Sequence, residues 1–322
     1  MCHSISQKDI FFHRLFLSKT VKRFATWHGT LQEWAVAAIE EQLIQQHVQR
    51  ALAEDIGTGD VTTNALLPAE AMGSATIIAR ESLTVCGTAF AQEAFAQLSG
   101  KTNFRTVIED GMVVGAGATL LKIEAPCRTL LTAERTALNY LQRLSGIATQ
   151  AARYVEAVHG TGVLILDTRK TTPGYRALEK YAVVCGGGWN HRLGLYDRVL
   201  IKDNHLDAFS AQNGNELCNA VQLAREKNLG IPVEVEVDHP DQVLPVLEAG
   251  ADCLLLDNFS IQQICKVVEF VDGQTCIEAS GGITLETVSN YAGLGLDFIS
   301  TGALVHQSRW VDIGLDWKGP VA

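Results

Sequence analysis

The sequence predicts an α/β protein in which a parallel α/β barrel follows a smaller α+β unit. After Gly162, short β-rich runs alternate with helix-patterned segments, and the strands are almost continuously apolar, as in a parallel sheet covered on both faces. No GxGxxG turn follows the first strand, which favours a closed barrel over a dinucleotide-binding sheet. The expected strands are residues 163–167, 198–203, 233–237, 253–258, 276–280 and 298–302.

Between these strands the apolar spacing predicts helices, including one over the segment TLETVSNYAG. Upstream, residues 34–56 have helical spacing and end at Gly57, and residues 74–125 read as strand, helix and two further strands. A long helix is expected from about Thr129 to His159. If Thr132 caps it, Arg135 lies in the first turn, where the helix dipole disfavours a cation, which hints at an external partner for Arg135.

The first thirty residues have a different composition. Five cations stand against one acid there, and the patch FFHRLFL is amphipathic. The segment can be an organelle-targeting leader or the tail of an over-long assigned start. It is therefore left out of the fold prediction.

Composition excludes several classes of protein. The chain has 322 residues, of which 47% are hydrophobic, and its formal net charge of -10 disfavours nucleic acid as a partner. No apolar run reaches the roughly 18 to 20 residues that span a membrane. The eight cysteines form no CxxC pair, which argues against a zinc site or a disulfide scaffold and favours reduced thiols in a cytosolic protein.

One stretch, Asp167 to His205, reverses the sign of the charge. It holds seven Lys and Arg residues against four Asp and Glu residues. Unpaired buried charge costs several kcal/mol per ion. A cationic cluster beside apolar strands therefore predicts an anionic ligand.

Polar residues follow every expected barrel strand, at the end where barrels build active sites. Cations follow the early strands, acids the middle strands and glycines the late strands. In chain order they are Asp167, Arg169 and Lys170; Lys202 and Asp203; Glu236; Asp257 and Asn258; Ser280 and Gly281; and Gly302. This sorting is harder to assign to chance than any single polar strand end.

The acids and the glycines each have a chemical interpretation. Glu234 and Glu236 share one face of the run VEVEV, so both point into the barrel or both point out. Glu236 and Asp257 can hold Mg²⁺ or stabilise positive charge on a sugar carbon, or they can pair with lysines. Ser280, Gly281, Gly282 and Gly302 lie in turns whose backbone N–H groups can bind phosphate, or they are plain turn residues.

A triple glycine, residues 186–188, precedes Trp189, Asn190, His191 and Arg192. Glycines there suit a backbone held close to a ligand. A lone His191 would more often be structural, but beside Arg192, Arg169 and Lys202 it is a candidate donor to carboxylate or phosphate. Arginine suits bidentate carboxylate recognition, so the ligand should carry carboxylates as well as phosphate.

These segments together resemble one enzyme family. EDIGTGDVTT, TAERTALNYLQRLSGIAT, DTRKTTPGYRALEKYAVVCGGGWNHRLGL, IKDNH, VEVEV, LLLDN, ASGGIT and TGAL occur in this order, as in the quinolinate phosphoribosyltransferases. The likeness covers about residues 34–315. It implies conversion of quinolinate and phosphoribosyl pyrophosphate, with Mg²⁺, to nicotinate mononucleotide, pyrophosphate and CO₂, in the cytoplasmic synthesis of NAD.

The resemblance also implies an architecture. It gives an open α/β barrel over residues 128–303 and an N-terminal α/β sandwich over residues 34–127, to which residues 304–322 can return. Residues 1–33 stay outside as an extension. The family assembles as a homodimer or a higher oligomer, with Arg135 reaching into the partner's active site.

Residue roles carried over from the family complete the prediction. The quinolinate carboxylates would be bound by Arg169, His191, Arg192 and Lys202, with Arg135 from the other subunit and Thr168 beside them. Lys170 would meet the pyrophosphate, and Glu236 and Asp257 the ribose and the metal. The 5′-phosphate would lie on Ser280, Gly281, Gly282 and Gly302.

Three alternatives remain open. A molybdenum-transport-associated relative keeps part of this pattern, although the carboxylate-binding set here is complete. The residues alone also allow a Schiff-base barrel lyase with Lys202 as the nucleophile. A non-enzymatic sensor of phosphate ligands would require Glu236 and Asp257 to be dispensable.

Overall fold

The computed structural model describes residues 39–210 and 214–320 of the chain, and the expected extension lies outside these residues. The chain divides into two compact units. Among the described residues, the barrel unit contains residues 154–170, 189–210 and 214–303, and the N-terminal unit contains residues 39–153, 171–188 and 304–320. The predicted boundary at residues 127 and 128 therefore falls at the start of a helix, and residues 128–153 and 171–188 belong to the same unit as the N-terminal sheet.

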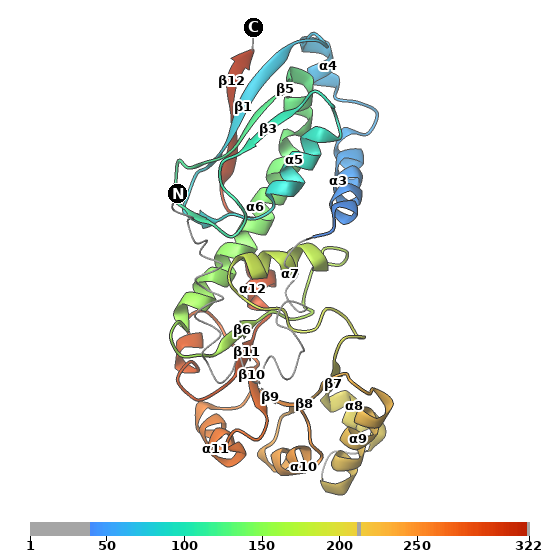
Figure 1. Cartoon of the computed structure of the whole chain (residues 1–322), viewed down its shortest axis with the longest axis vertical. Coiled ribbons are helices and arrows are strands. Elements are labelled where there is room, and N and C mark those ends of the chain that lie inside the picture. Colours follow the sequence, from blue (N-terminus) through green and yellow to red (C-terminus); the bar gives the residue numbers. More distant parts are fainter. Residues whose placement is uncertain (1–38, 211–213, 321–322) are drawn as a thin grey trace, which may run out of the picture. The chain divides into compact units, whose positions relative to one another are not determined.

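The N-terminal unit is built on a four-stranded sheet, β12-β1-β5-β3 (Figure 1). Its strands are β1 (Met72–Ala79), β3 (Asn103–Thr106), β5 (Thr119–Pro126) and β12 (Ile313–Pro320). Burial alternates along β1, so one face of the sheet is covered. A second, two-stranded sheet pairs β2 (Leu83–Thr84) with β4 (Val113–Val114). The C-terminal strand β12 runs antiparallel to β1 in this sheet.

Helices α3 (Glu41–Ile56), α4 (Val61–Leu66), α5 (Thr88–Ala96), α6 (Cys127–Ala157) and α7 (Arg176–Cys185) complete the N-terminal part. The carboxylate of Asp60 caps α4 by accepting the backbone N–H of Thr63 at 2.9 Å. Helix α6 begins at Cys127, two residues before the expected start at about Thr129, so Thr132 does not cap it. Arg135 is therefore in the third turn, and the first-turn dipole argument for an external partner was wrong.

The barrel unit contains one six-stranded parallel sheet, ordered β6-β11-β10-β9-β8-β7. The strands are β6 (Leu164–Leu166), β7 (Val199–Ile201), β8 (Val233–Val237), β9 (Cys253–Asp257), β10 (Cys276–Ser280) and β11 (Phe298–Ser300). All six strands expected from the sequence are present. Because β6 and β7 lie at opposite ends of the order, the barrel is open, as the resemblance implied, and the closed barrel expected from the pattern was wrong.

Helices α8 (Asp203–Phe209), α9 (Gly214–Lys227), α10 (Val243–Glu248) and α11 (Ile261–Val271) lie along the outer side of the curved sheet (Figure 1). A 3₁₀ turn, η1 (Pro240–Gln242), leads into α10, and α12 (Ala303–His306) follows β11. The segment TLETVSNYAG was expected to be a helix but forms only the 3₁₀ turn η2 (Val288–Asn290). Gly281 and Gly282 precede this segment and Gly293 ends it, and its apolar spacing is too short to sustain an α-helix.

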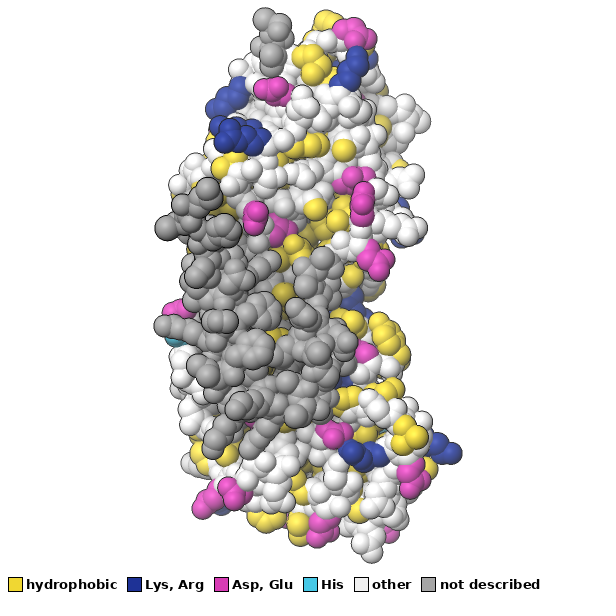
Figure 2. All heavy atoms as spheres, in the orientation of Figure 1, with side chains coloured by type: hydrophobic (Ala, Val, Ile, Leu, Met, Phe, Trp, Pro, Cys, Tyr) yellow, Lys and Arg dark blue, Asp and Glu magenta, His cyan; other side chains and the backbone are white. Residues whose placement is uncertain are grey.

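The described part of the chain has no helix both long enough and apolar enough to cross a membrane. The cysteines in it are all free thiols. On the face drawn in Figure 2, basic and acidic side chains are scattered rather than gathered into one patch.

Candidate active site

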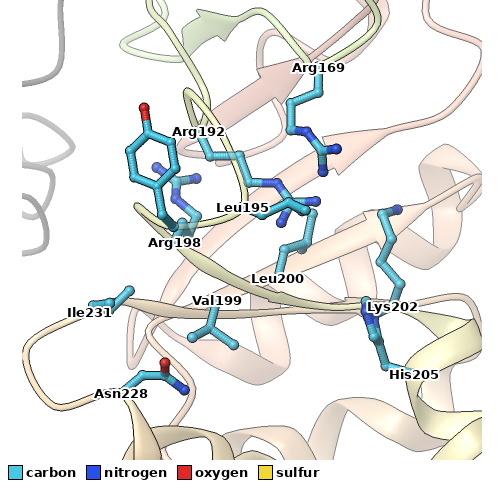
Figure 3. A pocket seen from close by; sticks show the side chains of 11 residues that line it. Arg169, Arg192, Leu195, Arg198, Val199, Leu200, Lys202, His205, Asn228 and Ile231 are labelled. Atoms are coloured by element: carbon cyan, nitrogen blue, oxygen red, sulfur yellow. The ribbon is translucent and has the colours of Figure 1, made fainter.

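A cavity of about 440 Å³ runs along the edge strand β7 of the barrel unit, from Asn228 and Ile231 before β8 to Lys202 and His205 after β7. Figure 3 shows the guanidinium groups of Arg169 and Arg192 pointing toward the same space, with the Lys202 side chain extending into it from the end of β7. Arg198 also lines the cavity, together with the apolar side chains of Leu195, Val199 and Leu200. We call this cavity the anion pocket. It combines convergent cations with apolar walls, which suits a planar anion.

The two arginines Arg169 and Arg192 repel each other across the anion pocket. Burial, followed by the positive charge of Arg169, lowers the pKa of Arg192 from its ordinary value. Placing like charges together costs free energy unless an opposite charge binds between them. The geometry therefore favours occupation by an anion.

The loop that carries Arg192 is fixed by backbone hydrogen bonds to two buried or half-buried acids. Asp167, fully buried after β6, accepts the backbone N–H of His191 and the side-chain amide of Asn190, both at 2.8 Å. Asp197 accepts the N–H groups of Leu193 and Gly194 at 2.6 and 3.0 Å. A Cβ at Gly194 would lie 2.4 Å from the ring of Tyr196, so a larger residue there would push this exposed ring aside.

His191 is buried beneath the anion pocket and is not among the side chains that line it. Its Nδ1 accepts the backbone N–H of Arg192 at 2.8 Å, and its Nε2 lies 3.1 Å from the Glu234 carboxylate. Arg198 donates to the same carboxylate oxygen at 3.1 Å. Both ring nitrogens of His191 thus have partners inside the protein, so direct binding of a carboxylate by His191 stays a prediction that this geometry does not favour.

The acidic side of the site begins at Glu236, whose carboxylate forms an ion pair with Lys202. Burial raises the pKa of Glu236; Lys202 opposes this, and the negative charges of Asp257 and Asp203 add to it. Glu234 and Glu236 point to the same side of β8, as the alternation in VEVEV predicted. Both form salt bridges, and Glu236 also stands beside Asp257 at the end of the neighbouring strand.

The glycine turn after β10 is tightly packed against the turn after β9. Ser280 pairs with Asp257 in the sheet, and its carbonyl accepts the backbone N–H of Asn258 at 3.0 Å. Gly281 has φ +96°, and a Cβ there would lie 2.2 Å from the Asn258 side chain, so only glycine fits. Because no α-helix begins after Gly282, phosphate binding by a helix N-terminus is not available at this turn.

The remaining predicted site residues lie in several places. Thr168 and the exposed Lys170 follow β6 in the barrel unit, where the Thr168 hydroxyl accepts the backbone N–H of Lys170 at 3.0 Å. Gly302 is buried after β11. Arg135 is exposed on α6, in the other unit, and its side chain makes no hydrogen bond or ion pair among the described residues.

The N-terminal unit has a larger cavity of its own, of about 700 Å³. Thr136, Asn139 and Arg143 line it from α6. Arg143 pairs with the buried Glu179 at 2.9 Å, and Glu179 also accepts the backbone N–H of Thr172 at 2.8 Å. The loop that follows Lys170 is thereby tied to α6 and α7.

Sequence reasoning missed two members of the barrel site. Arg198 was counted in the positive stretch but given no place in the pocket, and Glu278 was not considered. A single acid in the middle of the apolar strand CIEAS, at a position that alternation places inside the barrel, was the available signal.

Comparison with known proteins decides the family. Residues 60–145 match the N-terminal domain of quinolinate phosphoribosyl transferase, and residues 147–316 match its C-terminal domain. The chain belongs to the quinolinate phosphoribosyltransferase family. All the motifs quoted from the sequence fall within or next to these matches, and the residues of the anion pocket lie in the C-terminal one.

Members of this family from distant organisms are similar over most of the chain. A Mycobacterium leprae protein named nicotinate-nucleotide pyrophosphorylase (carboxylating) is 42% identical over 275 residues, which are 84% of this chain and 95% of that protein. A mitochondrial quinolinate phosphoribosyltransferase (decarboxylating) of Nicotiana glauca is 37% identical over 84% of this chain and 81% of its own length. The Francisella tularensis nicotinate-nucleotide pyrophosphorylase structure superimposes with a TM-score of 0.83, at 37% identity, covering 88% of this chain and 99% of that one.

Proposed function

We propose that this quinolinate phosphoribosyltransferase family member converts quinolinate and phosphoribosyl pyrophosphate to nicotinate mononucleotide, pyrophosphate and CO₂, for NAD biosynthesis. The observation that carries the proposal is the convergence of Arg169, Arg192 and Lys202 on one pocket with apolar walls. Quinolinate is a planar dicarboxylate, so its charges and its ring match the two kinds of lining. Family membership supplies the second substrate.

Quinolinate binding falls to the cations of the anion pocket. Arg169 and Arg192 hold the carboxylates, and their mutual repulsion is relieved when the dianion lies between them. Lys202 adds a point charge at the end of β7. Thr168 lies next to Arg169, and His191 contributes by holding the backbone of Arg192. The apolar side chains of Val199 and Leu200 face the pyridine ring.

Phosphoribosyl pyrophosphate is assigned to the acidic and glycine-rich strand ends. Lys170 meets the pyrophosphate, and the 5′-phosphate lies on Ser280, Gly281, Gly282 and Gly302. Without a helix N-terminus after Gly282, the phosphate contacts come from the serine hydroxyl and from backbone N–H groups. Glu236 and Asp257 face the ribose.

Magnesium fits the donor set at the same place. Carboxylate oxygens are its preferred protein ligands, and the charge of Asp257 helps to raise the pKa of Glu236, so a cation beside them is favoured. Glu236 and Asp257 would hold the ion together with the substrate's phosphates. When bound, Mg²⁺ neutralises charge on the departing pyrophosphate.

The reaction proceeds by exchange at the ribose and then loss of a carboxylate. The pyridine nitrogen forms a bond to the anomeric carbon as the bond to pyrophosphate breaks, and Glu236 and Asp257 stabilise the oxocarbenium-like sugar. The carbon–carbon bond to the 2-carboxylate then breaks and releases CO₂. Its electron pair stays on the ring carbon beside the quaternised nitrogen until a proton is taken up. The protein mainly orients the two substrates.

The functional unit is proposed to be a homodimer, or a higher oligomer built from it. Arg135 would enter the partner's anion pocket and complete its carboxylate clamp, which gives this exposed arginine an anionic partner. A cytoplasmic location is proposed because the cysteines of the described residues are free thiols, as is usual for proteins of reducing compartments.

The direct test is turnover by the purified chain with quinolinate, phosphoribosyl pyrophosphate and Mg²⁺. Nicotinate mononucleotide, pyrophosphate and CO₂ should appear in equal amounts. A Schiff-base lyase predicts instead that borohydride traps a carbonyl substrate on Lys202, although a lysine ion-paired with Glu236 is poorly placed to act as a neutral nucleophile. Absence of the mononucleotide, or its formation without CO₂, contradicts the proposal.

A further inference from the structure

Glu278, in the middle of β10, is an acid with no role in the reaction described above. Its side chain is 0% exposed. Within the part of the chain that the structure describes, neither of its carboxylate oxygens makes a hydrogen bond of ordinary geometry, although the Ser300 hydroxyl and the Glu234 carboxylate lie beside it. One Glu278 oxygen lies 3.5 Å from Nε2 of His191. Ionising a carboxyl group that is fully buried costs several kcal/mol of folding free energy, so the protonation state of Glu278 needs a physical explanation.

The tautomer of His191 decides how the neighbouring charges are shared. The backbone N–H of Arg192 can only donate, so Nδ1 of His191 is an acceptor and the ring's proton is on Nε2. That N–H faces the Glu234 carboxylate at 3.1 Å, and Arg198 donates to the same oxygen, also at 3.1 Å. The Arg198 guanidinium lies 3.2 Å from Nε2 as well, but a ring nitrogen that carries the proton cannot accept from it. Both strong donors therefore serve Glu234.

The groups around Glu278 make a second carboxylate unfavourable. Glu234 from β8, His191 from the loop before β7 and Arg198 at the start of β7 face it, with the Cys253 thiol of β9 and the Ser300 hydroxyl of β11. Burial, and then the negative charge of Glu234, raises the pKa of Glu278 well above its ordinary value. Burial would also raise the pKa of Glu234, but His191 and Arg198 together lower it.

We propose that Glu278 is a positioning residue that works as a neutral carboxylic acid, packed against His191 and Glu234 so that these two groups hold Arg192 and Arg198 in the anion pocket. A neutral acid leaves the proton of His191 Nε2 and the Arg198 guanidinium to Glu234. An ionised Glu278 would compete for both donors. It would also place a negative charge beneath a pocket that binds anions.

A metal ion is the other occupant that this cluster suggests. One ligand atom each from His191, Glu234 and Glu278 lie within 4.8 Å of one another. The Nε2 atom of His191 carries its proton toward Glu234, however, and Arg198 already supplies a cation to that carboxylate. The geometry thus provides a proton and a guanidinium where a metal ion would have to bind.

The first test reads the proton directly by infrared spectroscopy of the full-length protein at neutral pH. A protonated carboxyl absorbs at higher frequency than a carboxylate, and the difference spectrum of wild type minus Glu278→Gln isolates this residue. A protonated-carboxyl band that is present in the wild type and missing from the variant is expected. A carboxylate band in that difference spectrum overturns the proposal, as does a stoichiometric metal ion that elemental analysis finds in the wild type and not in the variant.

The second test asks whether a neutral side chain at position 278 is sufficient for quinolinate binding. Glutamine has the shape of a neutral glutamic acid, so Glu278→Gln should keep quinolinate affinity, measured by calorimetry, within about threefold of wild type. Glu234→Gln removes the carboxylate that pairs with Arg198 and should weaken quinolinate affinity by more than about tenfold. An equal loss in both variants contradicts a neutral Glu278. The affinity test rests on the proposed function, because it takes quinolinate as the ligand, whereas the infrared test reads the proton on Glu278 whatever the substrate is.

Discussion

Lys202 and Glu236 form an ion pair between neighbouring strands, the lysine just after β7 and the glutamate inside β8. The lysine belongs to the anion pocket, and the glutamate stands beside Asp257 on the acidic side of the site. This pair is therefore the point at which the predicted quinolinate and ribose sites meet. Changing either residue should affect both substrates.

The pH dependence of the reaction should reveal the Glu236 carboxylate. Burial raises its pKa, so kcat/KM should fall as the pH decreases through a value above that of an ordinary glutamate. Lys202 opposes this shift, so Lys202→Met should move the acidic limb to higher pH, and Glu236→Gln should lower kcat by about 100-fold or more. The control is Glu70→Gln, which alters an exposed ion pair with Lys101 and should change neither quantity. Identical acidic limbs in wild type and Lys202→Met would contradict the assignment of this limb to Glu236.

Arg135 should act across a subunit interface. Arg135→Ala is expected to raise the KM for quinolinate, and Arg169→Ala to do the same from the other side of the clamp. Mixed dimers of the two variants form one intact site in two and should recover part of the activity. Arg153→Ala, which removes another exposed arginine of α6, is the matched control and should stay active. No recovery on mixing, with subunit exchange verified, contradicts the shared site.

The buried pair of Glu234 and Arg198 should matter for stability as well as for binding. Both side chains are 0% exposed, and Glu234→Ala leaves the guanidinium without its counter-charge. The loss should be about 3–5 kcal/mol in urea unfolding. Glu70→Ala breaks the exposed pair with Lys101 and should cost far less, because water screens that pair. Comparable losses of unfolding free energy in the two variants would show that the buried pair stabilises the protein no more than an exposed pair does.

Glu278 should leave its mark on the pH dependence of stability. Its pKa is raised in the folded protein, so between the unfolded value, about 4.3, and the folded value only the folded state binds the proton. The free energy of unfolding should therefore fall with rising pH across this window, by about 1.4 kcal/mol per pH unit from this group. Glu278→Gln lacks this contribution. Its stability relative to wild type should thus rise through the window, and parallel curves would argue against a raised pKa.

The barrel strands could be predicted from the sequence because their signal is local. Runs such as CLLLD and VEVEV are apolar or β-branched throughout and are bounded by polar turns. The prediction of a helix before β11 was wrong. The segment has few apolar residues and ends at a glycine-rich turn, and it forms only a 3₁₀ turn. The start of α6 was misplaced because Thr132, a plausible cap, instead donates its hydroxyl to Asp60 at 2.9 Å.

The candidate site could be predicted in its outline only. Strand ends of a parallel sheet meet at one edge, so Arg169 and Lys202 were expected together and both line the anion pocket. The hydrogen-bond partners of His191 could not be predicted. One is the backbone N–H of Arg192 and the other is Glu234 on β8, and no rule of sequence spacing connects His191 with Glu234. Glu278 was missed for the same reason: its role depends on how two distant residues divide their hydrogen bonds.

Selectivity for quinolinate over nicotinate tests the anion pocket most directly. The two compounds differ by one carboxylate, and Arg169, Arg192 and Lys202 are placed to bind a dianion. Initial rates with each compound, phosphoribosyl pyrophosphate and Mg²⁺ should give kcat/KM at least about 100-fold higher for quinolinate, since losing a charged hydrogen-bonded group costs about 2–5 kcal/mol. Arg192→Ala should erase most of that preference. Equal use of nicotinate by the wild-type protein would contradict the proposed carboxylate clamp.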